Sequence, residues 1–257
     1  MNRKILIAAN WKQNGTSKSL SKLTFNIIAN LKHKKNRGEI VLFPPSIYID
    51  TIKKILEKKN KHNIFCGIQN ISEYESGAYT GEISIQMAKD LKCKYCIIGH
   101  SERRIIFKEQ QSSLTNKIMT SLRGQIKTIY CIGETLSEYN KKFTKRIISH
   151  QLQQGLKKSL KFIKTDPGKL IVAYEPVWAI GTGKNASESD IINVHKHIRK
   201  VLFSMFGKDS DKIRIIYGGS VNSKNANTIL NINEVDGVLV GGASLNSKKF
   251  VEICSSI

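Results

Sequence analysis

A single carboxylate stands at the end of an apolar run, directly before a loop of unusual composition. The run from Lys169 to Tyr174 is typical of a buried strand, and Glu175 follows it. Pro176 prevents this strand from continuing as an ordinary central one. The loop that follows has an apolar body, residues 177–180, and the glycine-rich tail Gly181-Thr-Gly-Lys184. An acid beneath a loop too apolar to prefer water indicates a catalytic base under a lid that excludes water.

The glycine-rich tail fits neither of the two nucleotide-binding motifs that it resembles. A P-loop needs glycine at position 178, which is Trp, and Ser or Thr at position 185, which is Asn. A dinucleotide fingerprint needs a tight turn after the strand, but five residues separate Glu175 from Gly181. The tail therefore predicts lid hinges and a backbone amide at Gly181 that meets a phosphate.

Polar and glycine residues follow the other apolar runs at the points where they end. The set comprises Asn10, Lys12, Gln69, Asn70, His100, Ser101, Glu102, Gly218, Gly219, Ser220, Gly241 and Gly242. Glycine lets a backbone approach a ligand, so the glycines after the last two runs predict a phosphate site. His100 precedes a predicted helix start, whose positive dipole favours a neutral imidazole. Lys12 would point a cation into the same site.

Eight strand-like runs alternate with helical segments along the 257 residues. The predicted strands are Ile5–Trp11, Glu39–Phe43, Ile64–Gln69, Tyr95–Gly99, Thr128–Gly133, Leu170–Tyr174, Ile213–Tyr217 and Val238–Val240. The predicted helices include Leu20–Leu31, Ile47–Leu56, Ile105–Leu122, Ile147–Ile163 and Ile191–Phe206. This alternation predicts an α/β protein with eight parallel strands and outer helices, a (β/α)8 TIM barrel formed by residues 1–257 as one domain. A doubly wound sheet is the main alternative.

Composition limits the classes of function. No apolar run is long enough to span a bilayer, and the short run Ile5–Ala9 predicts a strand rather than a signal peptide. Five cysteines, several in strand-like runs, favour buried thiols in a cytoplasmic protein. Cys93 and Cys96 have the spacing of zinc ligands but lack a second pair, so we expect no metal and no cofactor.

The net charge of +22 raises the alternative of a nucleic-acid-binding protein. The lysines occur in short groups along the whole chain, such as Lys53 and Lys54, Lys157 and Lys158, and Lys248 and Lys249. Because they are not gathered in one arm, we expect no specific binding to nucleic acid. A positive field would still attract an anionic substrate.

Taken together, these residues resemble the triosephosphate isomerase family over essentially the whole chain. The matching segments are Asn10-Trp-Lys12 with Asn14-Gly15, Gln69-Asn70, Gly77 with Thr80-Gly-Glu82, Ile98 to Arg104, Cys131-Ile-Gly-Glu134, Tyr174 to Lys184, Tyr217-Gly-Gly-Ser220 and Gly241-Gly-Ala243. The resemblance implies interconversion of dihydroxyacetone phosphate and D-glyceraldehyde 3-phosphate through an enediolate, in glycolysis and gluconeogenesis.

The same resemblance implies a role for each matching residue. Glu175 would move the proton, His100 would polarise the substrate oxygens, and Lys12 would supply positive charge. Asn10 would help to orient the substrate, and Glu102 would be an accessory group. The amides of Gly181, Ser220, Gly241 and Gly242 would hold the phosphate. The pairing of a carboxylate base with a neutral histidine is a standard example of pKa tuning in this family, so it is implied by the resemblance rather than by the spacing of the residues.

The resemblance also implies a homodimer, in which the loop Ile71–Glu82 reaches into a partner subunit. Gln13, Ile68 and Tyr79 differ from the residues common in the family in the region used for dimer contacts. Asn185 differs at the second hinge of the lid. A sugar-phosphate aldolase or a ribose-phosphate isomerase remains an alternative, but an aldolase that forms a Schiff base needs a desolvated lysine, for which Lys12 is the candidate.

Overall fold

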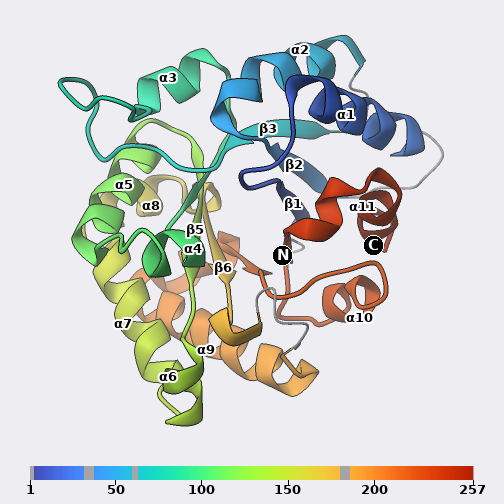
Figure 1. The fold of residues 1–257 in the computed structure, drawn as a ribbon. Coiled ribbons are helices and arrows are strands. Elements are labelled where there is room, and N and C mark those ends of the chain that lie inside the picture. The colour runs from blue at the N-terminus through green and yellow to red at the C-terminus, as the bar shows by residue number, and fades with distance from the viewer. Residues whose placement is uncertain (1–2, 32–37, 60–62, 180–185, 257) are drawn as a thin grey trace.

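A sheet of parallel strands closes into a barrel, and helices cover its outside (Figure 1). The computed structural model describes residues 3–31, 38–59, 63–179 and 186–256. Among these residues the strands are β1 (Leu6–Asn10), β2 (Glu39–Phe43), β3 (Ile64–Ile68), β4 (Tyr95–Ile98), β5 (Lys127–Ile132), β6 (Leu170–Tyr174), β7 (Arg214–Tyr217) and β8 (Gly237–Val240). Each strand pairs with the next, and β8 pairs with β1, all in parallel. The predicted (β/α)8 barrel is confirmed, because a doubly wound sheet would keep two open edges.

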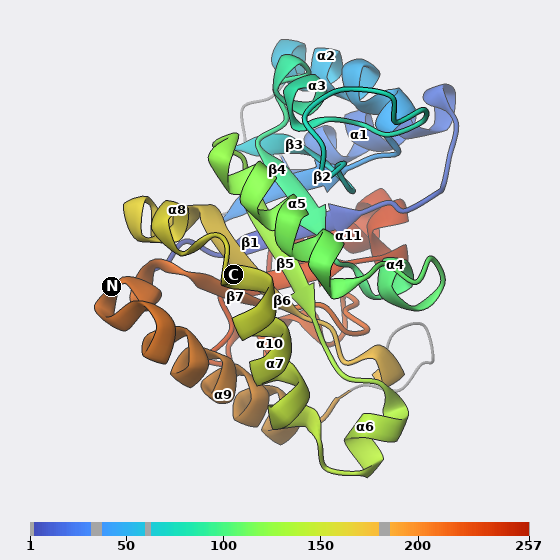
Figure 2. The ribbon, with the colours of Figure 1, turned by 90° about the vertical axis from the view of Figure 1, so that its left-hand side faces the viewer.

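Helices connect the strands and lie on the outside of the barrel, as Figure 2 shows for α5, α7 and α9. The helices are α1 (Ser17–Leu31), α2 (Ile49–Lys59), α3 (Ile85–Asp90), α4 (Ser101–Ile105), α5 (Gln111–Arg123), α6 (Leu136–Asn140), α7 (Thr144–Leu156), α8 (Leu160–Thr165), α9 (Glu188–Phe206), α10 (Ala226–Leu230) and α11 (Ser247–Cys254). Capping boxes begin two of them: Thr135 and Glu138 start α6, and Ser187 and Asp190 start α9.

Two of the predicted helices are each divided into two. In the predicted helix 105–122, α4 ends at the first residue, Ile105, and α5 begins only at Gln111. Lys108, in the connection, has a left-handed φ of 55° that its residue type does not indicate. The segment 147–163 forms α7 and α8, with a turn at 157–159. Buried residues continue at helical spacing through this turn, so the hydrophobic pattern could not reveal it.

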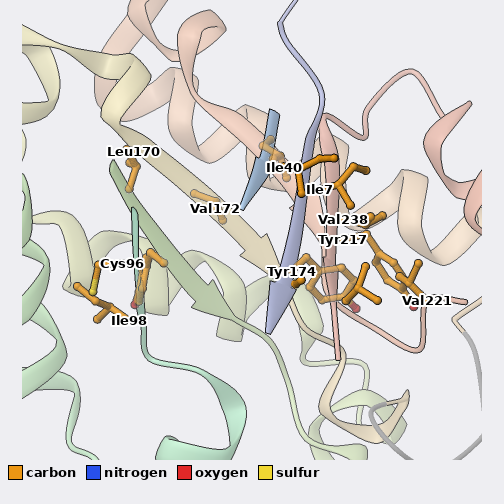
Figure 3. Close-up of a cluster of buried hydrophobic side chains, with 14 of the residues drawn as sticks. Ile7, Ile40, Cys96, Ile98, Leu170, Val172, Tyr174, Tyr217, Val221 and Val238 are labelled. Carbon is orange, nitrogen blue, oxygen red and sulfur yellow. The ribbon is translucent and has the colours of Figure 1, made fainter. Parts of the chain in front are cut away.

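The strands are apolar on both faces because both faces are buried. In β1, Leu6 and Ala8 pack inside the barrel, while Ile7 and Ala9 pack against the helices. Figure 3 shows the outward-facing layer, including side chains from β1, β4, β6, β7 and β8. This double burial explains why the strands read as continuous apolar runs rather than alternating ones.

A buried ionic network closes the N-terminal end of the barrel. Glu39 accepts hydrogen bonds from Tyr95 (2.5 Å) and Arg214 (2.6 Å), and Lys127 lies 3.2 Å from its other oxygen. Burial tends to raise the pKa of Glu39, but these hydrogen bonds and cations outweigh it and lower the pKa to about 2. The network ties β2, β4, β5 and β7 together at the end opposite the predicted site.

A neutral histidine packs behind the ends of β6 and β7. His195 of α9 is fully buried, and its Nδ1 lies 2.9 Å from the carbonyl oxygen of Glu234. Its ring lies 6.0 Å from that of Tyr174 and 6.5 Å from that of Tyr217. Burial lowers the pKa of His195 to about 4, so the folded protein holds the ring neutral at neutral pH.

This burial predicts a loss of stability in mild acid. The unfolded chain takes up a proton near pH 6.5, whereas folded His195 does so only near pH 4. The contribution of neutral His195 to the free energy of unfolding is therefore fully present above pH 6.5. Up to about 3 kcal/mol of it is lost as the pH falls from 6.5 to 4. In urea titrations across this range, His195→Asn should flatten the pH dependence, while exposed His150→Gln should not. Equal slopes in the wild type and the His195 variant would contradict the assignment of this pH dependence to His195.

Candidate active site

A cavity of 300 Å³ opens at the C-terminal end of the barrel and gathers most of the predicted site residues. Its walls include Asn10, Lys12, His100, Glu175, Ser220, Gly241 and Gly242. Glu102 lines an adjoining cavity of 690 Å³ that shares Asn10, Lys12 and His100 with the first. The predicted residues Gly181 and Asn185 lie outside the described residues.

The Glu175 carboxylate is buried at this end of the barrel, with 2% of the residue exposed. Its Oε2 accepts a hydrogen bond of 2.9 Å from the backbone N–H of Ser101, and its Oε1 lies 3.2 Å from Nε2 of His100. Its backbone N–H donates to the carbonyl of Ile132. The carboxylate is thus held by two residues that follow β4, and the backbone of Glu175 is held by the neighbouring strand β5.

Two glycines leave the space that Glu175 occupies. A Cβ on Gly218 would lie 2.8 Å from Cγ of Glu175, and one on Gly133 would lie 1.7 Å from its carbonyl oxygen. Atoms do not approach this closely, so both positions require glycine if Glu175 is to keep its place. The sequence indicated Gly218 as part of a phosphate site, but its contact here is with the predicted base.

His100 is oriented by the helix that follows it. As the N-cap of α4, it accepts a hydrogen bond of 3.2 Å at Nδ1 from the N–H of Glu102. A nitrogen that accepts a hydrogen bond carries no proton, so the hydrogen of the neutral ring is on Nε2. Nε2 is the nitrogen that faces Glu175. The neutral imidazole expected from the sequence is therefore supported by the hydrogen bonding of the ring.

Lys12 has an unusual backbone conformation, with a φ of 52°. Three side chains hold this segment: Asn10 accepts from the N–H of Lys12 (3.0 Å), Gln69 donates to its carbonyl (2.9 Å), and Asn14 donates to the carbonyl of Trp11 (2.8 Å). Gln69 also donates to the carbonyl of Phe43 and so links β1 to β2. Gln69 and Asn10 act on the backbone here, a role that the sequence did not reveal. A left-handed lysine retained at a cavity is typical of a functional constraint.

The ammonium of Lys12 and the carboxylate of Glu102 form an ion pair of 2.5 Å. The side chains are 29% and 39% exposed, so water reaches both groups. The other oxygen of Glu102 lies 3.6 Å from Nδ1 of His100. Glu102 therefore contacts both cavity residues that the sequence placed beside it.

The loops after β7 and β8 form the opposite wall of the cavity. Ser220 donates from its hydroxyl to the carbonyl of Ala179, at a distance of 2.6 Å, and so connects the β7 loop to the base of the predicted lid. Gly241 lies beside the Lys12 side chain, and a Cβ there would stand 3.6 Å from its Cε. Gly242 has open space around it and begins a short 3₁₀ helix, Gly242–Leu245. The Lys12 side chain and the Gly241 backbone thus lie side by side, an arrangement that could bind an anion.

A buried acid anchors the start of the predicted lid. Glu134 accepts at Oε1 from Tyr174 (3.1 Å) and from Trp178 Nε1 (2.8 Å), and its carbonyl accepts from the N–H of Val177. Burial raises the pKa of Glu134. The ring of Tyr139 in α6 packs on that of Trp178 at 4.4 Å. These contacts fix residues 177–179, the first part of the loop that follows Glu175.

Thiols near the site are buried and inert. Burial, together with the nearby Glu175 carboxylate, raises the pKa of Cys131 well above its ordinary value. All five cysteines are free. Among residues 3–31, 38–59, 63–179 and 186–256, no group of three or more histidine, cysteine or acidic side chains could hold a metal ion.

Comparisons with known proteins agree with this geometry. The sequence model of the family described as triosephosphate isomerase matches residues 5–257. The triosephosphate isomerase of Lawsonia intracellularis is 45% identical over 97% of each chain. That of Marinobacter nauticus is 38% identical over 99% of this chain and 98% of its own. That of Aspergillus oryzae is 39% identical over all of this chain and 99% of its own.

The chain belongs to the triosephosphate isomerase family. The family resemblance drawn from the motifs is confirmed, and with it the prediction of an aldose–ketose isomerase. In enzymes with this fold, the active site lies at the C-terminal end of the barrel.

The space beside Glu175 provides a direct test of the site. Gly218→Ala should displace the carboxylate, because the new methyl group would lie 2.8 Å from Cγ of Glu175. We expect kcat to fall by about one to two orders of magnitude, as misplacing a catalytic group by about 1 Å does. Steady-state kinetics would measure this. Gly168→Ala, whose Cβ would meet only Asp166 at 3.4 Å, is the control. A Gly218 variant with unchanged kcat would show that Glu175 does not need this position.

Proposed function

We propose that Glu175, His100 and Lys12 carry out the interconversion of dihydroxyacetone phosphate and D-glyceraldehyde 3-phosphate, a reaction of glycolysis and gluconeogenesis. Family membership supports the reaction, and the observation that supports the assignment is the 3.2 Å approach of Glu175 Oε1 to His100 Nε2 in a cavity that Lys12 also lines. A base, a hydrogen-bond donor and a cation meet where one small substrate fits.

The reaction requires these three groups for separate reasons. A proton on the carbon next to a carbonyl is weakly acidic, so its removal needs a positioned base and a stabilised oxyanion. Glu175 takes the proton from one carbon and returns it to the neighbouring carbon. The bond electrons pass into the enediolate, whose oxygens accept from Nε2–H of His100. One carbon is oxidised from alcohol to aldehyde while its neighbour is reduced from ketone to alcohol, so the reaction needs no external oxidant or reductant.

The arrangement of His100 and Glu175 implies a change when the substrate binds. Each group now engages the other, while the reaction needs Nε2–H to face the substrate oxygens and Oε1 to face carbon. The Nδ1 bond to the Glu102 N–H holds the ring in place during this exchange. The N–H at the start of α4 donates to Nδ1 of His100, so the proton of the ring stays on Nε2 whether Nε2 faces Glu175 or the substrate.

Lys12 and the backbone of the last two loops would hold the anionic parts of the substrate. Lys12 supplies fixed positive charge, and Asn10 orients it through the backbone. Glu102 is the accessory group that positions the ammonium in the absence of substrate. The amides of Ser220, Gly241 and Gly242 would hold the phosphate, and Gly181 would add a further amide. Such sites after strands seven and eight recur in barrels of this kind.

The base assignment is tested by shortening Glu175 by one methylene. Glu175→Asp should fold normally but lower kcat by orders of magnitude, because the carboxylate moves away from the substrate carbon. A coupled assay of the conversion between the two triose phosphates measures the rate. Exposed Glu57→Asp serves as the control for the substitution itself. An unimpaired Glu175→Asp enzyme would remove Glu175 from the mechanism.

The Schiff-base alternative receives no support from Lys12. Its ammonium forms an ion pair with Glu102 and is partly exposed, whereas a lysine that forms a Schiff base is desolvated. Glu175 and its glycines would also have no part in that reaction.

We also propose that two copies associate through the loop Ile71–Glu82. In this loop the rings of Tyr74 and Tyr79 stack at 3.9 Å and are 46% and 41% exposed. Ile47 (80% exposed) and Phe107 (66% exposed) add apolar surface at the same end of the barrel. Exposed apolar surface of this kind marks an interface. The loop of one copy would enter the 690 Å³ cavity of the other, which Gln13 lines.

Two of the sequence departures are placed in this region, and one is not. Gln13 lines the cavity and Tyr79 lies in the protruding loop. Ile68 is fully buried in β3, within the layer between sheet and helices. Ile68 therefore makes no surface contact of its own, and its influence on an interface stays a prediction.

The association predicts a concentration-dependent mass. Tyr79→Asp adds a charge to the protruding loop and should shift sedimentation velocity toward the monomer while lowering kcat. Phe203→Asp, at an exposed position of α9, is the matched control and should leave the mass unchanged. A monomeric wild type, or a Tyr79→Asp protein that sediments as the wild type does, would contradict the proposed interface.

One domain and a cytoplasmic location complete the proposal. The pairing of β1 with β8 joins the two ends of the chain in one sheet, which supports a single domain over residues 1–257. Five free buried thiols fit a reducing compartment. Within the described ranges, no helix combines the length and apolar character needed to span a bilayer.

A further inference from the structure

One segment of the chain carries strong positive charge without any acidic residue. Residues 139–165 contain eight lysines and arginines and no aspartate or glutamate. We call these eight residues the basic face; they are Lys141, Lys142, Lys145, Arg146, Lys157, Lys158, Lys161 and Lys164. All eight side chains are exposed. The net charge of the chain alone did not indicate where on the molecule the positive charge would gather.

The fold arranges the basic face along the outside of the barrel. It begins after α6, follows α7 and ends in α8. Ile148, Leu152 and Leu156 bury the inner side of α7 against the barrel, so its outer side is left to polar residues. The neighbouring helix α9, which contacts α7, adds exposed Lys196 and Lys200. The cations therefore extend over two adjacent helices.

The basic face lacks the acidic partners that lysines have elsewhere in this protein. Lys54 lies 2.6 Å from Asp50, and Lys169 lies 3.2 Å from Asp166. In the part of the chain that the structure describes, none of the eight basic residues is within 4.0 Å of a carboxylate oxygen. Lys158 is linked to Glu73 through Asn116, which accepts from it at 2.8 Å. The charge of this face is thus left for an external anion.

Apolar surface on this face is small and partly covered by cations. The Arg146 guanidinium lies 4.4 Å from the centre of the Phe143 ring, and the Lys161 ammonium lies 5.0 Å from that of Phe162. Phe143 and Leu160 are only 38% and 37% exposed. A helix that enters a membrane presents a bare apolar side, whereas α7 has used its apolar side for packing. A linear polyanion fits this surface better than a bilayer.

We propose that the basic face binds the sugar–phosphate backbone of nucleic acid without sequence selectivity. At about 1.5 Å per residue, α7 is about 20 Å long. Phosphates of one strand recur about every 3.4 Å, so about six of them would lie along it. This binding is separate from the isomerase activity, because the face belongs to the segment between β5 and β6 and lines neither cavity. The Lys158 end of the face comes near the loop Ile71–Glu82, because Asn116 links Lys158 to Glu73, whereas the end at Lys141 and Lys142 follows α6.

The test is fluorescence anisotropy of a labelled 24-base-pair duplex titrated with the protein at several salt concentrations. Lys145, Arg146, Lys157, Lys158 and Lys161 are replaced together by Gln. The control replaces exposed Lys18, Lys22, Lys58, Lys248 and Lys249 by Gln, which removes the same charge from α1, α2 and α11. Both variants should keep wild-type isomerase activity, which shows that they fold.

We expect the first variant to lose at least about tenfold in duplex affinity near 50 mM salt, and the control to lose less than about threefold. If each of the five cations meets a phosphate, the magnitude of the slope of log affinity against log salt falls by about 4.5. A scrambled duplex should bind equally well. Equal losses in both variants, or a wild type that does not bind the duplex, would overturn the proposal. Tighter wild-type binding to phosphatidylserine vesicles than to duplex at the same salt would overturn it in favour of a lipid surface.

Discussion

The position of one buried carboxylate is the constraint on which the rest of this site depends. Glu175 is 2% exposed, and its two oxygens face the N–H of Ser101 and the Nε2 of His100. A buried acceptor left without a donor costs about 1–3 kcal/mol, and more when it is charged. The end of β4 must therefore present both donors to the end of β6. Strands two apart in a barrel direct side chains into the same layer of the interior, and this geometry brings them together.

The surrounding structure serves this arrangement at several levels. Gly133 and Gly218 leave room for the acid, and the start of α4 fixes the tautomer of His100. Glu134 anchors the loop that begins directly after Glu175. The closed sheet supplies the rigidity, because each strand is hydrogen-bonded on both sides and packed on both faces. A catalytic group held to within a fraction of an ångström needs this kind of support.

Prediction from the sequence succeeded where burial and chemistry leave a linear signal. Strands buried on both faces read as apolar runs, and the polar residues after them mark the cavity; Glu175, His100 and Lys12 were found in this way. It failed where the determining contact is between distant segments. Two such contacts are the hydrogen bond from Gln69 to the Lys12 carbonyl and the approach of Gly218 to Glu175. The break in the helix at Lys108 depends on a backbone angle that no local pattern shows.

The proposed chemistry depends on Glu175 moving a carbon-bound proton through an enediolate in this cavity. Converting dihydroxyacetone phosphate in D₂O and following the product by proton NMR tests this step, because a proton held by a carboxylate can exchange with solvent before it returns to carbon. We expect deuterium at the carbon next to the aldehyde of the glyceraldehyde 3-phosphate formed, and loss of both turnover and labelling in Glu175→Gln. Full turnover by Glu175→Gln, or deuterium labelling that persists in this variant, would contradict the role of Glu175.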